Sequence, residues 1–258
     1  MEFHIVICVK SVVLNAPEGQ VARLPESSIL NPFDLPALEM ALRIREERGG
    51  QITALSMGPD SASLALYECI SLGVDRALLV SDPALAGSDT LVTSTVLSMA
   101  INKLSNADLI ILGTRTSDSD TGQVGPQTAT LLDLPLVTGV CEIEFQDNLM
   151  LVIRKSDEFV EKFEARLPCV ITVNPTAVHP RDAKLVGIES AFKGRTIEKM
   201  GLSDLDLSTE FVGESGSPTK VLSMSPIKKD RKCDFIDGSV EEQAEKIVTY
   251  LKSKGFIR

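Results

Sequence analysis

Residues 107–135, ADLIILGTRTSDSDTGQVGPQTATLLDLP, decide the fold. The apolar run at 108–113 is typical of a strand buried on both faces. A polar loop then leads into a short helical pattern that ends at Pro135. The N–H groups at a helix start are unpaired and carry partial positive charge, so an anion binds well there. Gly122 and Gly125 would let a phosphate approach because they carry no Cβ.

The chemistry of this glycine turn points to holding a nucleotide without consuming it. Pro126 fits the first helical position, and Gln123, Gln127 and Thr128 offer side-chain donors. The chain has no G-x-x-x-x-G-K-[ST] motif, and its first strand does not lead into G-x-G-x-x-G, so no lysine is expected on a transferring phosphate. The alternative, which the residues leave open, is that the glycines and Asp120 form only a turn and a cap.

The same alternation of strand and helix extends outward through the first half of the chain. Strand-like runs stand at 4–9, 52–58, 77–81 and 108–113, with helical patterns at 34–48, 61–72 and up to 104 between them. Asp34 is expected to cap the first helix, with Pro36 in its first turn. The pattern predicts an α/β fold: a parallel, doubly wound, Rossmann-like sheet of the adenine-nucleotide-binding type, with helices on both faces. Ligands bind such sheets beyond the carboxyl ends of the strands.

The second half of the chain departs from this alternation. Four more strand-like segments follow at 137–145, 149–155, 158–165 and 168–174; the first three suggest β-hairpins, and the last returns to the sheet. We therefore expect a nucleotide-binding α/β domain over 1–192 and a C-terminal arm over 193–258. Residues 203–238 are too polar to build a core of their own. The arm ends in an amphipathic helix at about 239–254 that is expected to pack on another chain; folding back on its own domain is the alternative.

Composition excludes several other classes of function. The net charge of −10 argues against binding to nucleic acid, which needs clustered Lys and Arg. The chain opens directly into a strand, and no apolar run approaches about 18 residues, so we expect a cytoplasmic protein without membrane insertion.

The polar residues suggest neither a metal site nor a catalytic constellation. The five cysteines are scattered without a CxxC, and the two histidines lie in no cluster with metal-ligand spacing. Asp118 and Asp120 have no nucleophile or metal partner nearby, so they are expected to act as caps or as acceptors for ribose hydroxyls.

The motifs resemble those of electron-transfer flavoprotein β subunits nearly from end to end. The matching segments are ICVK (7–10), NPFD (31–34), SMGP (56–59), GVDRALLVSD (73–82), DSDTGQVGPQTATLLDLP (118–135), HPR (179–181) and GSPTKV (216–221). The resemblance implies a heterodimer, in which an α subunit carries a redox-active FAD and the β arm embraces it. The β site would hold AMP as a structural element or a second FAD. In relatives of the second kind, NADH reduces the β flavin, whose electrons then separate between a low- and a high-potential acceptor.

The resemblance also implies which residues bind the nucleotide. Those lining it would be Cys8, Asn31, Pro32, Phe33, Asp34, Met57 and Gly58. Those beside the flavin and its diphosphate would be Ser88, Thr90 and Thr93. Main-chain amides along Ser119, Asp120, Thr121, Gly122, Gln123, Val124, Gly125, Pro126, Gln127, Thr128, Ala129 and Thr130 would grip the phosphates.

The glycine turn separates the two kinds of relative. AMP-holding members read Asn-Gln-Thr-Gly there, whereas GQVGP at 122–126 is similar to the FAD-holding branch. We therefore expect FAD, with AMP as the alternative and NADH as the electron donor. Segments 11–14 and 115–117 differ from that branch. The loop at 82–93 also has a simpler interpretation, in which Asp89 caps the following helix. A stand-alone ATP-binding domain is a more distant alternative that leaves the arm unexplained.

A docking segment for a partner dehydrogenase is implied near residue 185. Its apolar residues are Leu185, Val186, Ile188 and Phe192, with Leu185 as the anchor entering a pocket on the partner. An acyl-CoA-type or other dehydrogenase is the expected partner, and ferredoxin is a candidate low-potential acceptor. The alternative is a helix face packed against its own sheet.

Overall fold

The computed structural model describes residues 3–13, 28–104, 106–146, 149–223 and 233–257. The chain forms two compact units, Met1–Val221 and Leu222–Arg258. Residues 193–221 of the expected arm thus lie in the first unit. That the arm packs on a partner subunit stays a prediction.

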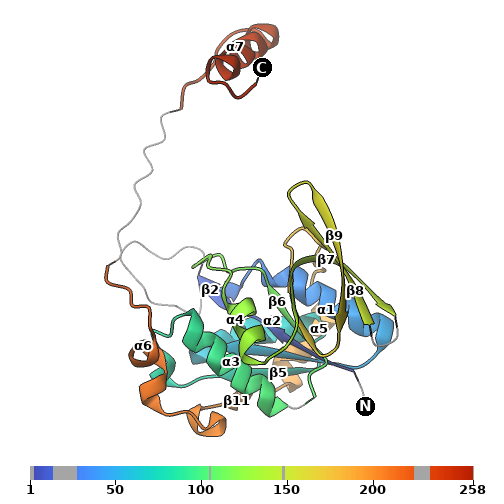
Figure 1. The fold of residues 1–258 in the computed structure, drawn as a ribbon, viewed down its shortest axis with the longest axis vertical. Coiled ribbons are helices and arrows are strands. Elements are labelled where there is room, and N and C mark those ends of the chain that lie inside the picture. Colours follow the sequence, from blue (N-terminus) through green and yellow to red (C-terminus); the bar gives the residue numbers. More distant parts are fainter. Residues whose placement is uncertain (1–2, 14–27, 105, 147–148, 224–232, 258) are drawn as a thin grey trace. The chain divides into compact units, whose positions relative to one another are not determined.

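The first unit is built on one large sheet with the strand order β11-β5-β4-β1-β6-β10-β7-β8-β9 (Figure 1). The strands are β1 (His4–Cys8), β4 (Gln51–Met57), β5 (Arg76–Val80), β6 (Leu109–Gly113), β7 (Leu136–Gln146), β8 (Leu149–Ser156), β9 (Phe159–Arg166), β10 (Cys169–Val173) and β11 (Glu198–Met200). Pairing is parallel from β11 to β7 and antiparallel from β7 to β9. This arrangement confirms the predicted sheet and its hairpins. A separate two-stranded sheet joins β2 (Ser11–Val13) to β3 (Ser28–Leu30).

Helices cover both faces of the sheet, as the alternation predicted. One core lies under α1 (Asp34–Arg48), α2 (Ser63–Leu72) and α5 (Leu185–Gly194), and the other under α3 (Thr90–Leu104) and α4 (Val124–Leu131). Successive strand side chains point to opposite faces. In β1, Ile5 and Ile7 accordingly join the first core, while Val6 and Cys8 join the second.

Residues 198–217 complete the second core. They form β11 at the edge of the sheet and the short helices η4 (Leu202–Leu205), η5 (Thr209–Phe211) and α6 (Gly213–Gly216). Leu205 and Val212 are buried in that core. The apolar side chains of this stretch therefore belong to a core of the first unit. Two further short helices, η2 (Asp60–Ala62) and η3 (Pro83–Leu85), lie in loops of the sheet domain.

The start of α1 differs from its prediction, whereas the start of α3 follows the simpler interpretation of its loop. The N-cap of α1 is Phe33, which makes no side-chain capping bond, so Asp34 is not the cap. Its carboxylate instead accepts the N–H of Lys10 at 2.8 Å. Asp89 does cap α3, because its Oδ1 accepts the N–H groups of Leu91 and Val92 at 3.0 Å each.

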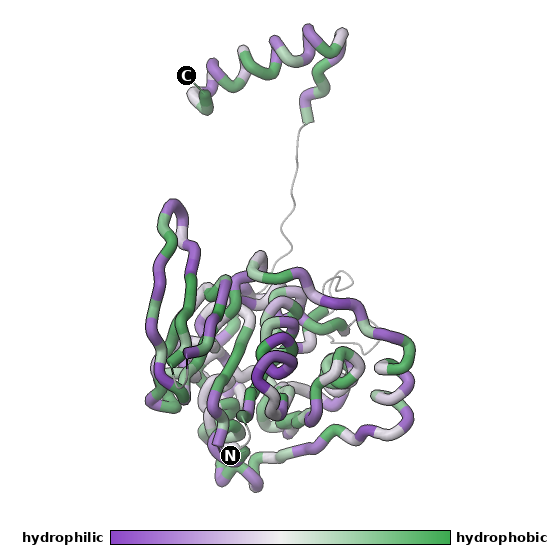
Figure 2. Tube along the Cα trace, turned by 90° about the vertical axis from the view of Figure 1, so that its right-hand side faces the viewer, coloured by the Kyte–Doolittle hydropathy of each residue, from purple (hydrophilic) through white to green (hydrophobic). Residues whose placement is uncertain are grey.

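The second unit carries α7 (Val240–Ser253), close to the predicted range. Ser239 and Glu242 form a capping box, each side chain accepting the other's main-chain N–H. Hydrophobic and hydrophilic residues alternate along the helix (Figure 2), and its described residues include no buried side chain. A helix of 14 residues is marginal on its own in water, and within its own unit α7 has no buried side chain to stabilise it.

Among the described residues, no helix combines the length and the apolar character needed to cross a membrane. The cytoplasmic location stays a prediction.

Candidate functional site at the carboxyl edge of the sheet

The strand order reverses between β1 and β6. From β1 the chain runs to β4 and β5 on one side, and it then returns to β6 and β10 on the other. In this register Cys8 lies opposite Leu55 on one neighbour and Leu112 on the other. The loops after β1 and β6 therefore border the switch point, which is where parallel sheets bind their ligands.

Asn31 joins these two loops. Its main-chain N–H donates to the carbonyl of Lys10 at 2.9 Å. Its Nδ2 donates to the carbonyl of Arg115 at 3.0 Å, and its Oδ1 accepts the N–H of Ser117 at 3.2 Å. Asn31 is fully buried. The structure thus brings the predicted segments 31–34 and 119–130 to the same edge of the sheet.

Asp34 is buried at the centre of this junction. Burial raises the pKa of its carboxyl to about 7, an effect that hydrogen bonds from Lys10, Asn31 and Gly113 partly offset. A Cβ on Gly113 would lie 2.3 Å from Asp34 Oδ1, so only glycine fits beside this carboxyl. Burial, and then the charge of Asp34, raises the pKa of the Cys8 thiol to about 12. Cys8 therefore acts as a small apolar side chain and not as a nucleophile.

The glycine turn offers a row of main-chain donors. Within the described part of the chain, none of the N–H groups of residues 121–125 has a hydrogen-bond acceptor. Gly122 has φ +64°, a left-handed conformation that favours glycine. The N-cap of α4, Gln123, makes no side-chain capping bond. Consecutive free N–H groups at a helix start form an anion-binding concavity, so the turn is suited to holding a phosphate.

Two details of α4 differ from the expectation. Pro126 is the third residue of the helix and not the first, which is still within the turn that needs no N–H donor. A Cβ on Gly125 would lie 2.6 Å from Thr172 Cγ2 in β10. The close packing of α4 on the sheet therefore requires this glycine, whatever binds above it. Sequence reasoning missed that requirement because Thr172 lies far along the chain.

Two buried hydroxyls at this end of the sheet lack hydrogen-bond partners among the described residues. They are Thr128 Oγ1 in α4 and Ser56 Oγ near the carboxyl end of β4. An unsatisfied buried polar group costs about 1–3 kcal/mol, so such groups call for an explanation. Thr128 belongs to the predicted binding segment, but its hydroxyl is covered by protein atoms, so a ligand at the turn does not explain the missing partner.

The start of α3 lies against the glycine turn. Thr90 Oγ1 donates to Gln123 Oε1 at 3.0 Å. Ser94 Oγ lies 3.1 Å from Gln127 Oε1, and its shortest hydrogen bond, at 2.7 Å, is to the carbonyl of Thr90 in its own helix. The structure thus joins the predicted loop at 88–93 to the predicted turn through side chains of both.

The other predicted residues make mostly local contacts. The hydroxyls of Ser88 and Thr130 donate to the carbonyls of Leu85 and Pro126. The main-chain N–H groups of Thr93 and Gly58 donate to the carbonyls of Asp89 and Val80. Ser119 shares a hydrogen bond with Thr116, Met57 packs against the second core, Ala129 is buried in it, and Pro32 is exposed.

The cations at this edge are paired with carboxylates of the loop after β6. Lys10 Nζ lies 2.8 Å from Asp118, and Arg115 Nε lies 3.3 Å from Asp120. The Arg115 guanidinium also lies 4.7 Å from the centre of the Phe33 ring. Neither aspartate caps α4. The ICVK motif was the sequence signal that could have pointed to Lys10 as a residue of this edge. Its partner, Asp118, is 108 residues away, so the pairing itself had no local signal.

The docking segment presents its larger apolar side chains to solvent. Leu185 is 84% exposed and Val186 76%, with Ile188 and Phe192 also exposed. The opposite, small-residue side of α5 packs on α2: a Cβ on Gly187 would lie 2.2 Å from the carbonyl oxygen of Ser71. The alternative of a packed helix face therefore describes the small residues of α5 and not Leu185 or Val186.

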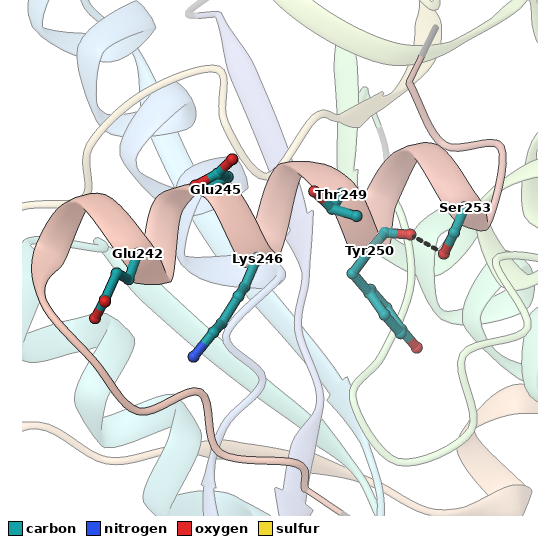
Figure 3. A pocket seen from close by; sticks show the side chains of 6 residues that line it. All are labelled: Glu242, Glu245, Lys246, Thr249, Tyr250 and Ser253. Carbon is teal, nitrogen blue, oxygen red and sulfur yellow. Dashed lines mark hydrogen bonds between the residues drawn. The ribbon is translucent and has the colours of Figure 1, made fainter.

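Side-chain hollows are also lined by residues outside the predicted binding segments. One runs along α7 and is lined by Glu242, Glu245, Lys246, Thr249, Tyr250 and Ser253 (Figure 3). Every lining residue comes from this single helix, so within its own unit the hollow has no facing wall. The other is lined by α1, α2 and residues 179–183. Within the described chain no three His, Cys, Asp or Glu side chains gather as metal ligands would.

Comparison with known proteins identifies the family. The family model described as the electron transfer flavoprotein domain matches residues 19–203. An electron transfer flavoprotein subunit beta from Thermoanaerobacterium thermosaccharolyticum is 37% identical over 89% of this chain and 88% of its own length. The caffeyl-CoA reductase-Etf complex subunit CarD from Acetobacterium woodii is 37% identical over 98% of this chain and 100% of its own. The acryloyl-CoA reductase electron transfer subunit gamma from Anaerotignum propionicum has the same identity and coverage. This chain belongs to the electron transfer flavoprotein family, among its beta subunits.

Proposed function

We propose that this chain holds a flavin adenine dinucleotide at the carboxyl edge of its sheet. With an α subunit, it would pass electrons between NADH, a dehydrogenase and a low-potential acceptor by flavin-based bifurcation. The flavin supplies the redox chemistry, and the protein supplies binding, orientation and electrostatics.

The observation that carries the nucleotide is the row of main-chain N–H groups at 121–125, which have no acceptor among the described residues. These groups would bind the diphosphate, and the hydroxyl side chains at the start of α3 would lie near it. Gly122 holds the turn in a left-handed conformation. The donors belong to the main chain and are fixed by the fold, so they need no reorganisation when an anion binds.

The partners are proposed from two uncovered apolar surfaces. The exposed Leu185 and Val186 of α5 are suited to anchor a dehydrogenase, and α7 is suited to pack on the α subunit. Relatives named for caffeyl-CoA and acryloyl-CoA reductases support an acyl-CoA-type dehydrogenase as the docking partner. We propose ferredoxin as the low-potential acceptor.

The alternative function is a β subunit that holds AMP as a structural nucleotide, with all redox chemistry on the α-subunit FAD. AMP also carries a phosphate that the free N–H groups would bind. The sequence GQVGP at 122–126, similar to the FAD-holding branch, favours the flavin.

Co-expression with the α subunit tests both functions. We expect two flavins per heterodimer and NADH-dependent reduction of ferredoxin only when the high-potential acceptor is present. One flavin with one AMP would establish the alternative. A heterodimer without any nucleotide on this chain would overturn both.

A further inference from the structure

Asp89 bonds two parts of the fold that are far apart in the sequence. Its Oδ1 caps α3 through the N–H groups of Leu91 and Val92. Its Oδ2 accepts the N–H of Thr219 at 3.0 Å, and its own N–H donates to Ser217 Oγ at 2.9 Å. Burial disfavours the charged form, yet the N–H groups of Val92, Thr219 and Leu91 hold the pKa of Asp89 below its usual value. The residue is therefore a carboxylate at neutral pH.

The segment that Asp89 holds is the base of the C-terminal arm. The buried Ser217 donates from Oγ to the carbonyl of Gly213 at 2.6 Å. Gly213 has φ +60°, and a Cβ there would lie 2.1 Å from the carbonyl oxygen of Ala84. The base is thus fixed against the loop before α3. The first compact unit ends at Val221, two residues after Thr219.

On its other side, Asp89 adjoins the glycine turn. The next residue, Thr90, donates to Gln123 Oε1 at 3.0 Å. Ser94, one helical turn later, lies 3.1 Å from Gln127 Oε1, although its shortest hydrogen bond, at 2.7 Å, is to the carbonyl of Thr90 in its own helix. A continuous path of hydrogen bonds and one peptide link therefore runs from Thr219 through Asp89 to the turn with the free N–H groups.

We propose that Asp89 is a positioning residue that couples the base of the arm to the nucleotide turn. This inference rests on the proposed function. An arm held by the α subunit keeps residues 217–219 in place, and Asp89 then holds the start of α3 against the turn. The coupling is reciprocal, so a bound nucleotide strengthens subunit association by the same factor by which association strengthens nucleotide binding.

The test measures nucleotide release from the purified heterodimer after dilution, for the wild type and four variants. Asp89→Asn keeps one acceptor for the helix cap but loses the charge. Ser217→Ala removes one of the two hydrogen bonds between Asp89 and the base of the arm, Thr90→Val removes the bond to Gln123, and both leave the cap intact. Asp82→Asn is the matched control: Asp82 caps η3 in the same loop through Ala84 N–H.

We expect Asp89→Asn, Ser217→Ala and Thr90→Val to release the nucleotide about five- to tenfold faster, the effect of losing one hydrogen bond. Asp82→Asn should stay within about twofold of the wild type. The ratio of the subunit affinity with nucleotide to the affinity without it should be smaller in the three path variants than in the wild type. A merely structural role would leave that ratio unchanged.

Two outcomes would overturn the coupling. One is wild-type release from Ser217→Ala and Thr90→Val, which would assign any effect of Asp89→Asn to the helix cap alone. The other is an unchanged affinity ratio in all three variants. A wild-type heterodimer that carries no nucleotide on this chain would instead overturn the proposed function, so the two failures are distinguishable.

Discussion

Gly125→Ala tests whether packing or ligand access requires this glycine. The backbone of Gly125 lies outside the left-handed region, so alanine is acceptable there in conformation. Its Cβ would, however, lie 2.6 Å from Thr172 Cγ2, closer than real Cβ contacts come. Such overpacking typically costs about 1–3 kcal/mol. Alanine in a helix recovers about 0.5–1 kcal/mol relative to glycine, so we expect a net loss of about 1–2 kcal/mol.

Thr172→Ser provides the matched background. It removes the clashing methyl group but keeps the hydroxyl that accepts the N–H of Gly139 at 3.1 Å. In that background Gly125→Ala should stabilise the chain by about 0.5–1 kcal/mol. Urea unfolding of the four chains gives the coupling energy, which we expect to be about 1–3 kcal/mol.

The same four chains separate the two reasons for the glycine. If packing alone requires it, the double variant recovers both stability and nucleotide content. If the nucleotide also needs the space, the double variant recovers stability but not nucleotide. An equal cost of Gly125→Ala in both backgrounds would refute the packing argument.

Three further predictions concern buried charge and the exposed anchor. The folded chain binds the Asp34 proton more tightly than the unfolded chain does, because burial raises the pKa of this carboxyl. The free energy of unfolding should therefore fall by about 2–3 kcal/mol from pH 5 to pH 7 and level off at higher pH. In urea titrations Asp34→Asn should lack this slope, and a variant that keeps the wild-type slope would refute the assignment. Arg181→Met leaves the buried Glu39 without its main partner and should lower the free energy of unfolding by about 2–3 kcal/mol. The loss is somewhat smaller than for a fully buried pair, because Arg43 still contacts Glu39. Adding Glu39→Gln should restore most of the lost stability, and a double variant whose two effects simply add would contradict the pairing. Leu185→Ala should leave thermal unfolding unchanged but weaken binding of the dehydrogenase about tenfold. Val160 is also exposed, and Val160→Ala should leave this binding unchanged. Equal effects of the two substitutions on binding would exclude Leu185 as the anchor.

The features that sequence reasoning predicted correctly depend on local contacts. The alternation of strand and helix reads directly as a doubly wound sheet. The cap by Asp89, the simpler interpretation of its loop, spans two or three residues, so the sequence contains both partners side by side. The two-sided burial of β1 likewise follows from its unbroken apolar run.

The features that it missed depend on contacts between distant residues. An aspartate at a helix start usually caps the helix, but Asp34 meets N–H donors from the loop after β1 and the end of β6, and these outcompete the local bond. The requirement for glycine at 125 arises from Thr172. The partner of Lys10 is 108 residues away. Single-sequence patterns contain no signal for such pairs, because each residue type has many possible partners.

The pairing of charges at the carboxyl edge bears on what the site can do. In the described chain, Lys10 and Arg115 are each neutralised by an aspartate of the loop after β6, while the N–H groups of residues 121–125 have no acceptor. Phosphoryl transfer needs a cation placed to stabilise the charge that develops on the transferred group. Fixed N–H dipoles stabilise a phosphate whose charge does not change, and they do so without an ammonium group directed at its terminal oxygens. The electrostatics of this edge therefore fit the proposed role of holding a nucleotide without transferring its phosphate.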